Sequence, residues 1–150
     1  MANAQTICAA APLTGWIAEA FVASGAVADD AALAAAVLVR TTLRGSATHG
    51  VTRVLEYVEK LKDGAINARP NFAAEFRDGV LRCDCDLGLG QAVAMRAIRA
   101  AAAQAQETAA TICLIRNCGH LDAIGPYALD AAENGMIALL CKEAPPLMAL

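Results

Sequence analysis

The segment from Thr48 to Lys62 carries three chemically capable side chains at regular spacing. His49, Arg53 and Tyr57 stand four residues apart in the sequence THGVTRVLEYVEKLK. An α-helix turns once every 3.6 residues or so, and side chains at this spacing therefore form one stripe on its surface. A proton donor, a permanent cation and a phenol would then share a face. The same stripe is also typical of the solvated face of an amphipathic helix, and spacing alone leaves both interpretations open.

Two neighbours of His49 favour the interpretation as a site. Thr48 can cap a helix spanning residues 48–63, which would leave His49 in the first helical turn. Gly50 has no side chain and allows another segment of the chain to approach the imidazole closely. We therefore expect His49 at the start of a helix, next to a second chain segment.

A polar loop, RNCGHLDAIG at residues 116–125, is the second candidate. It follows a predicted strand and precedes a predicted helix, and α/β proteins bind ligands in loops at the carboxyl ends of their strands. His120, the only other histidine of the chain, lies in this loop. Its alternative is a loop histidine bonded to its own backbone, and Asp122 can either orient His120 or be solvated.

The sequence LGLGQAV invites comparison with the dinucleotide-binding pattern G-x-G-x-x-G. Gly88 and Gly90 match its first two glycines, but Val93 stands at the third position. The acidic residue expected after the next strand is missing, since Glu107 lies within a predicted helix. We interpret these glycines as a tight turn that starts a helix, and not as a phosphate loop.

Helices are predicted for the first 64 residues. Apolar spacing places them at about 13–24, 29–43 and 48–63, and Gly25, Gly45 and Gly64 follow them where C-terminal glycines are expected. Asp29 and Asp30 suit the N-terminus of the second helix. Residues 1–64 are therefore predicted to form a helical N-terminal subdomain.

A different pattern covers residues 65–150. Alternation on either side of Asp78-Gly79 predicts a β-hairpin, and it is followed by a helix at 91–107, a strand at 111–115, a helix at 126–133 and a buried strand at 136–141. This order predicts a mixed α/β fold with some parallel pairing. The apolar end APPLMAL lacks a closing helix, and we expect a sheet layer that is only partial, as in a truncated domain.

Composition excludes several classes of protein. The net charge is -3, from 12 basic and 15 acidic residues, without a basic block for nucleic acid. The longest apolar run has nine residues, whereas a membrane span needs about 20. No positive residue precedes Arg40, which argues against an export signal. The six cysteines form no CxxC pair, and no histidine stands at zinc-ligand spacing; we expect no metal site and reduced, mostly buried thiols in a cytoplasmic protein.

Four blocks carry a family resemblance. They are THGVTRVLEYVEKLKDGAIN, DLGLGQAVAMRAI, RNCGHLDAIGPYALDAAENGMIALL and PPLMA. In this order they resemble the malate/L-lactate dehydrogenase family of NAD(P)-dependent 2-oxoacid reductases, which includes ureidoglycolate, sulfolactate and diketogulonate enzymes. The family's chains are much longer, so the resemblance is to its N-terminal half.

The resemblance implies hydride transfer between NAD or NADP and C2 of a small 2-hydroxy or 2-oxo acid, on a non-Rossmann fold. Thr48, His49 and Gly50 match the triplet that supplies the general acid/base. Arg53 would bind the substrate carboxylate, and Tyr57 would lie on the substrate side. The resemblance also implies a homodimer for the full-length form.

His120 matches the family's second histidine, near both nicotinamide and substrate, and is therefore a candidate for catalysis, substrate binding and cofactor binding. The chain departs from the family pattern in two places. Asp122 stands where the family commonly has glycine, and an acid there can repel cofactor phosphates. Cys141-Lys142 replaces a pair of polar uncharged residues.

Two functions follow from different classes. The first is a 2-hydroxyacid dehydrogenase. The second is a non-catalytic truncated fragment that binds a partner through its unfinished sheet or apolar tail. In either case we expect the isolated 150-residue chain to be inactive, because much of the cofactor site would lie beyond residue 150.

Overall fold

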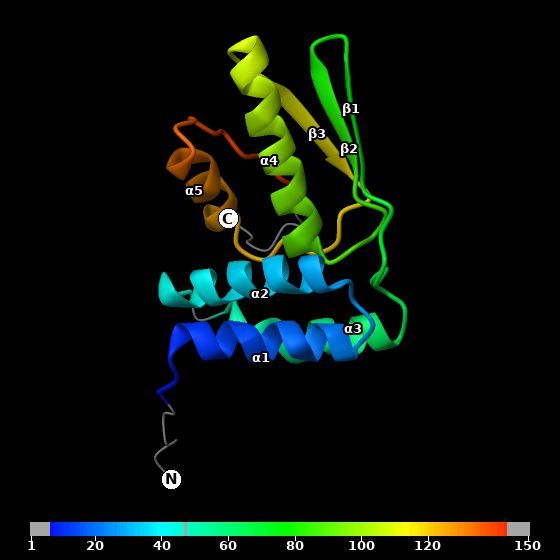
Figure 1. Ribbon diagram of the computed structural model, residues 1–150, viewed down its shortest axis with the longest axis vertical. Helices are drawn as coiled ribbons and strands as arrows, with labels where there is room; N and C mark the ends of the chain where they lie inside the picture. The colour runs from blue at the N-terminus through cyan, green and yellow to red at the C-terminus, as the bar shows by residue number, and fades with distance from the viewer. Residues whose placement is uncertain (1–6, 47, 144–150) are drawn as a thin grey trace, which may run out of the picture.

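The computed structural model describes residues 7–46 and 48–143. Helices α1 to α3 form a layer, and the sheet, α4 and α5 stand on that layer (Figure 1). The elements are α1 (Ala10–Ala23), α2 (Ala28–Leu43), the 3₁₀ helix η1 (Val51–Arg53), α3 (Val54–Lys62), β1 (Ala73–Arg77), β2 (Val80–Asp84), α4 (Gly90–Thr108), β3 (Ile112–Arg116) and α5 (Gly125–Glu133). The predicted mixed α/β fold with helices at its N-terminus is confirmed, while the domain boundary at residue 64 stays a prediction.

Helices α1 and α2 pack through small and apolar side chains. Ile17 and Phe21 of α1 meet Ala34 and Leu38 of α2 in the largest buried cluster. Alanines on α2 allow the helix axes to approach closely, and the cluster extends to α3 through Tyr57. This packing gives α3, which carries part of the site, a rigid base.

The third helix is shorter than predicted. Residues 48–50 form a bend, η1 follows, and α3 begins only at Val54. The backbone of Gly50 has φ +88°, outside the helical region, so the helix cannot extend back to Thr48. The prediction that Thr48 caps the helix and that His49 lies in its first turn is therefore wrong.

The sheet contains three strands in the order β1-β2-β3. β1 and β2 form the predicted antiparallel hairpin, whose turn residues Asp78 and Gly79 both have positive φ, as a type I′ turn requires. β2 and β3 pair in parallel through the crossover helix α4. One face of the sheet is covered by α4, which packs on Leu81, Cys83 and Cys113.

The strand predicted at residues 136–141 is absent. Residues 136–143 form no regular structure, and the side chains of Ile137 and Leu139 are exposed. Within the described residues the sheet ends at β3, and residues 136–141 do not pair with the free edge of that strand. An apolar run forms a strand only where a neighbouring strand takes up its backbone hydrogen bonds.

All six cysteines are free thiols, but their burial is less complete than predicted. Cys83 and Cys85 are buried, whereas Cys8 and Cys141 are exposed. No helix in the described ranges has the length and apolar character to span a membrane. Over residues 7–46 and 48–143, no three His, Cys, Asp or Glu side chains come together as a metal site would require.

Candidate active site

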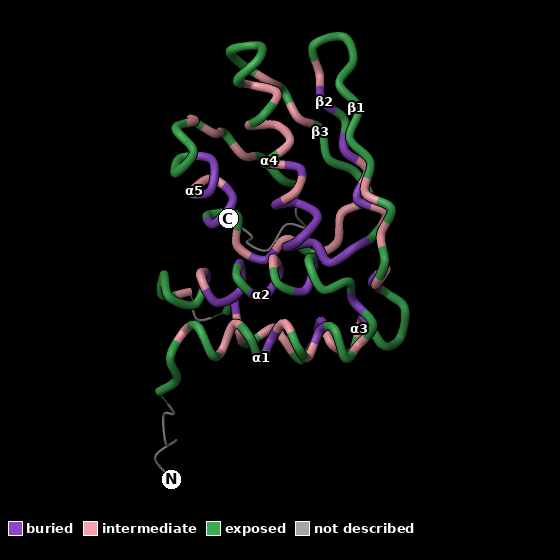
Figure 2. The backbone as a smooth tube through the Cα atoms, viewed as in Figure 1, coloured by how far each residue is buried: buried purple, intermediate pink, exposed green. Residues whose placement is uncertain are grey.

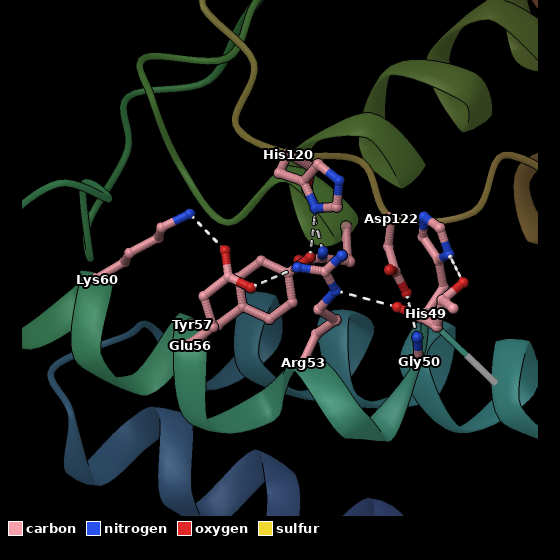
Figure 3. Close-up of polar contacts among 10 residues, drawn as sticks. His49, Gly50, Arg53, Glu56, Tyr57, Lys60, His120 and Asp122 are labelled. Carbon is pink, nitrogen blue, oxygen red and sulfur yellow. Dashed lines mark hydrogen bonds and ion pairs between the residues drawn. The ribbon is translucent and has the colours of Figure 1, made fainter. Parts of the chain in front are cut away.

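Two segments far apart in the sequence meet above α3. The first runs from Thr48 to Tyr57, and the second is the loop after β3 that carries His120 and Asp122 (Figure 3). Both predicted segments therefore contribute to one site. The rings of His49 and His120 lie 6.2 Å apart between centroids, with 23° between their planes.

Tyr57 holds the ring of His120. Its hydroxyl lies 2.7 Å from His120 Nδ1, and its side chain is 1% exposed. Burial and the charge of Asp122 raise the pKa of Tyr57 above its ordinary value, so the phenol keeps its proton near neutral pH. With Nδ1 engaged by Tyr57, Nε2 is the ring nitrogen of His120 that remains available to a ligand.

The charge state of His120 is set by opposing effects. Desolvation lowers the pKa of His120 below its ordinary value, and the charges of Lys142 and Arg53 act in the same direction. The carboxylate of Asp122 opposes them. Because desolvation is the largest effect, the neutral imidazole is favoured near pH 7.

The backbone of His120 is fixed by the start of α4. Gln91, which is fully buried, donates from Nε2 to the His120 carbonyl oxygen at 3.1 Å. A Cβ on Gly90 would overlap with that same oxygen, so only glycine allows this contact. Gly90 thus leaves room for the His120 loop at the first residue of α4. This agrees with the interpretation of the LGLG glycines as a tight turn that starts a helix.

Gly50 and Asp122 connect the two segments directly. The Gly50 amide donates to Asp122 Oδ2 at 2.7 Å. Asp122 is 1% exposed, and its Oδ1 has no hydrogen-bond partner within the part of the chain that the structure describes. A Cβ on Gly50 would overlap with Thr42 Oγ1, so the glycine allows α2 to approach the backbone of this turn closely. Asp122 is therefore buried, and is not the solvated loop residue that was one of its alternatives.

Arg53 is held in place by its own neighbours. Its Nε donates to the Thr48 carbonyl at 3.1 Å, and its Nη1 donates to Glu56 at 2.8 Å. Hydrogen bonds from Lys60 and Arg53 lower the pKa of Glu56 to about 2. Since Glu56 is ionised near pH 7, the guanidinium is oriented before any ligand arrives, and its Nη2 makes no hydrogen bond to the described residues.

Every predicted site residue lies in this region. Tyr57 is buried, so it does not belong to a solvated helix face. Thr48 forms a hydrogen bond through Oγ1 with His49 Nδ1 at 2.9 Å. Sequence analysis missed the roles of Glu56 and Gln91. The spacing of Glu56 from Arg53 and Lys60 is a recognisable helical ion-pair pattern, whereas nothing in the sequence marks Gln91.

Comparisons with known proteins give the family of this chain. The family model described as malate/L-lactate dehydrogenase matches residues 8–150. A malate dehydrogenase of Pyrococcus horikoshii is 38% identical over 127 residues, which cover 83% of this chain and 35% of that protein. An L-sulfolactate dehydrogenase of Methanocaldococcus jannaschii is 32% identical over 126 residues, covering 83% of this chain and 37% of that protein.

A solved structure gives the same result. The malate dehydrogenase structure from Pyrococcus horikoshii OT3 superposes with a TM-score of 0.79 at 34% identity, covering 84% of this chain and 36% of that chain. The chain thus spans little more than a third of the length of the relatives that it matches. With a family model matched from residue 8 to residue 150 and a shared fold, the chain belongs to the malate/L-lactate dehydrogenase family.

Proposed function

We propose that this chain supplies the substrate anchor and the proton donor of an NAD(P)-dependent dehydrogenase that interconverts a 2-hydroxy acid and a 2-oxo acid. One observation carries the proposal. Two imidazoles whose centroids are 6.2 Å apart lie in the same site as a guanidinium that its own neighbours already orient. Reduction of a 2-oxo acid needs both kinds of group, a cation for the carboxylate and an acid for the new hydroxyl.

Arg53 is the proposed carboxylate anchor. A guanidinium carries five N–H donors, and the contacts to Thr48 and Glu56 use only part of them. Because those contacts fix the guanidinium plane, less side-chain freedom is lost when a carboxylate binds. Tyr57 and Thr48 would complete the substrate side, each through its contact with one of the histidines.

One of the two histidines is the proposed acid/base. His120 has Nε2 free, and its lowered pKa favours a neutral ring that can accept a proton from a hydroxy acid. His49 is held by Thr48 through Nδ1, which leaves its Nε2 for the substrate. In both rings the hydrogen bond to the protein is made by Nδ1, so Nε2 of either ring can face the substrate, and mutation distinguishes the two.

The cofactor would be NAD or NADP. A ureidoglycolate dehydrogenase of Escherichia coli is named with NAD(+) and a sulfolactate dehydrogenase of Chromohalobacter salexigens with NADP(+), and both are relatives. The exposed ring of His120 fits a neighbour of the nicotinamide, which when bound would supply or accept the hydride. The Gly88–Gly90 turn does not fit the phosphates, because the His120 loop fills the space at Gly90.

We propose further that the full-length protein is a cytoplasmic homodimer, as the family resemblance implies. A second candidate function is partner binding by a chain that is not catalytic alone. Its supporting observation is the open face of β3, where Ile112 is 63% and Leu114 is 56% exposed. The two candidates differ in one testable respect. Only the first expects residues 1–150 to become catalytic when they are joined to the C-terminal part of a family member.

A chimera tests the proposal. Residues 1–150 are joined to the C-terminal remainder of the Pyrococcus horikoshii malate dehydrogenase, and NADH or NADPH oxidation is followed with several 2-oxo acids. We expect turnover by the chimera and none by the 150-residue chain. His49→Asn and His120→Asn should differ, with kcat about 10²–10⁴-fold lower for the true acid and a smaller loss for the other.

Arg53→Lys tests the anchor in the same chimera. Loss of the planar donor fork should cost about 1.5–3 kcal/mol of substrate binding, seen as a higher KM. Arg44→Lys, on an exposed residue after α2, is the matched control and should leave KM unchanged. Unchanged kinetics for Arg53→Lys, or wild-type kcat in both histidine variants, would contradict the assigned roles.

A further inference from the structure

We propose that Asp122 is a positioning residue, which fixes the turn carrying His49 against the loop carrying His120 through its hydrogen bond with the Gly50 amide. The expected effect of Asp122 on turnover rests on the proposed function, whereas its effect on the two backbone segments does not. The role concerns the relative placement of two imidazoles and assigns no proton transfer to Asp122.

The bond itself is short and shielded from water. Gly50 N lies 2.7 Å from Asp122 Oδ2, and both residues are buried. The bond joins residues 72 positions apart in sequence, so it closes the site between two separate parts of the fold.

The turn at Gly50 has a local backbone bond, from Arg53 N to the Gly50 carbonyl oxygen at 3.0 Å, and it also depends on contacts with distant segments. Gly50 has φ +88° and precedes a 3₁₀ helix of three residues, and this conformation is one that glycine can leave easily. On one side the turn rests on α2, where Val51 N donates to Thr42 Oγ1 at 2.9 Å. On the other side the contact is Asp122, seen beside Gly50 in Figure 3.

The remaining oxygen of Asp122 shows that the contact is costly. Oδ1 is buried and without a hydrogen-bond partner in the described ranges, and an unsatisfied buried acceptor costs free energy. Asp122 also has φ +61°, a left-handed conformation that aspartate adopts at less cost than most side chains. Buried, strained and half-satisfied groups of this kind concentrate at functional sites.

The position of the bond explains what it controls. His49 is the residue before Gly50, and His120 lies two residues before Asp122. Movement of either backbone segment is therefore passed directly to one imidazole. The 6.2 Å separation of the two rings is set at this bond together with the contact between Tyr57 and His120.

Hydrogen exchange on the 150-residue chain tests the positioning role without activity. Deuterium uptake is measured by mass spectrometry in peptides that cover Gly50 and His120, for Asp122→Ala and Asp122→Asn. The alanine variant removes the acceptor, whereas asparagine keeps one carbonyl oxygen for the Gly50 amide. Asp130→Ala is the matched control, because Asp130 is also a buried aspartate but pairs with Arg99 between α4 and α5.

We expect Asp122→Ala to speed exchange at least about tenfold in both peptides, since the bond that protects them is lost. Asp122→Asn should stay near the wild type, and Asp130→Ala should speed exchange in α5 but not at Gly50. Unchanged exchange at Gly50 in Asp122→Ala would overturn the proposal. Equal acceleration by Asp130→Ala would overturn it too, because it would show general loosening.

Kinetics in the chimera add a readout that a merely structural residue would not give. Asp122→Ala should lower kcat about tenfold or more with a smaller change in KM, because the misplaced groups act mainly in the transition state, and Asp122→Asn should restore most of the loss. An active chimera in which Asp122→Ala keeps its kcat would overturn the proposal. A chimera inactive with the wild-type sequence would contradict the proposed function, and hydrogen exchange would then decide on Asp122 alone.

Discussion

The two faces of the three-stranded sheet differ in how far they are covered. On one face Leu81 and Cys83 are buried beneath α4, and on the other Ile112 and Leu114 of β3 remain exposed. Figure 2 colours parts of β2 as buried, whereas β3 is coloured intermediate or exposed. The difference follows from the strands themselves. β2 alternates apolar and polar residues and needs cover on one face only, whereas β3 reads ICLIR and is apolar on both.

This comparison shows what an apolar sequence can and cannot specify. The composition of β3 is that of a strand buried on both faces, but burial depends on what lies against it. The segment at 136–141 is a second case, since it is as apolar as β3 and forms no strand. Four predictions test the contrast between the covered and the open region.

The largest effect is expected for matched leucines. Leu38 is fully buried where α1 packs on α2. Leu38→Ala should lower the free energy of unfolding of the protein by about 2–5 kcal/mol. Leu114→Ala on the open face should stay within about 0.5 kcal/mol. Urea denaturation of both variants measures the difference. Equal losses would show that the open face is covered in solution.

Self-association is the next effect. An exposed apolar edge strand offers its backbone and side chains to other molecules, so the chain should form oligomers through β3. Leu114→Glu places an acid opposite Arg82, its partner across the sheet, and should shift the chain toward monomer without loss of fold. Light scattering measures the mass. Leu55→Glu, on an exposed part of α3, is the control, and an equal shift there would contradict the assignment to β3.

Ion pairs give a smaller contrast. Asp130 accepts two hydrogen bonds from Arg99 in the covered region, at 2.9 and 3.2 Å, and Asp130→Asn should cost about 1–2 kcal/mol of unfolding free energy. Asp84 pairs with Arg116 on the open face at 2.9 Å, where solvent screens the charges, so Asp84→Asn should cost less. Denaturation in low and high salt separates them. A greater cost at Asp84 would reverse the ranking.

The smallest effect concerns pH. Partial desolvation of the ring lowers the pKa of His120, so the unfolded chain takes up this proton at a higher pH than the folded chain. The contribution of His120 to stability is therefore complete above the ordinary histidine pKa, about 6.5, and is lost as pH falls through the lowered value. The pKa of His120 is measured by NMR titration of the Leu114→Glu variant, which is expected to be the more monomeric form. The His120→Asn change in the same variant identifies the His120 signal. Asp122→Asn should lower the pKa of His120 further, and a rise would contradict the charge effect of Asp122.

Sequence alone determined the local elements of this protein. Helices α1, α2, α4 and α5 and the β1–β2 hairpin lie within three residues of their predicted bounds, because apolar periodicity, glycine stops and the Asp78-Gly79 turn are local signals. It also determined the family, since four blocks occur in order, and it identified the residue types that meet at the site. These signals need no knowledge of distant segments.

Only the tertiary structure decided how those elements combine. The backbone of Gly50 is held between α2 and Asp122, so the helix starts after His49 and not at Thr48. Gln91 became a support of His120 because α4 abuts the loop after β3. Residues 136–141 stayed irregular because no strand of the described residues takes up their backbone hydrogen bonds. Each outcome depends on a partner distant in sequence, and the free energy of such a contact exists only once folding has placed both partners together.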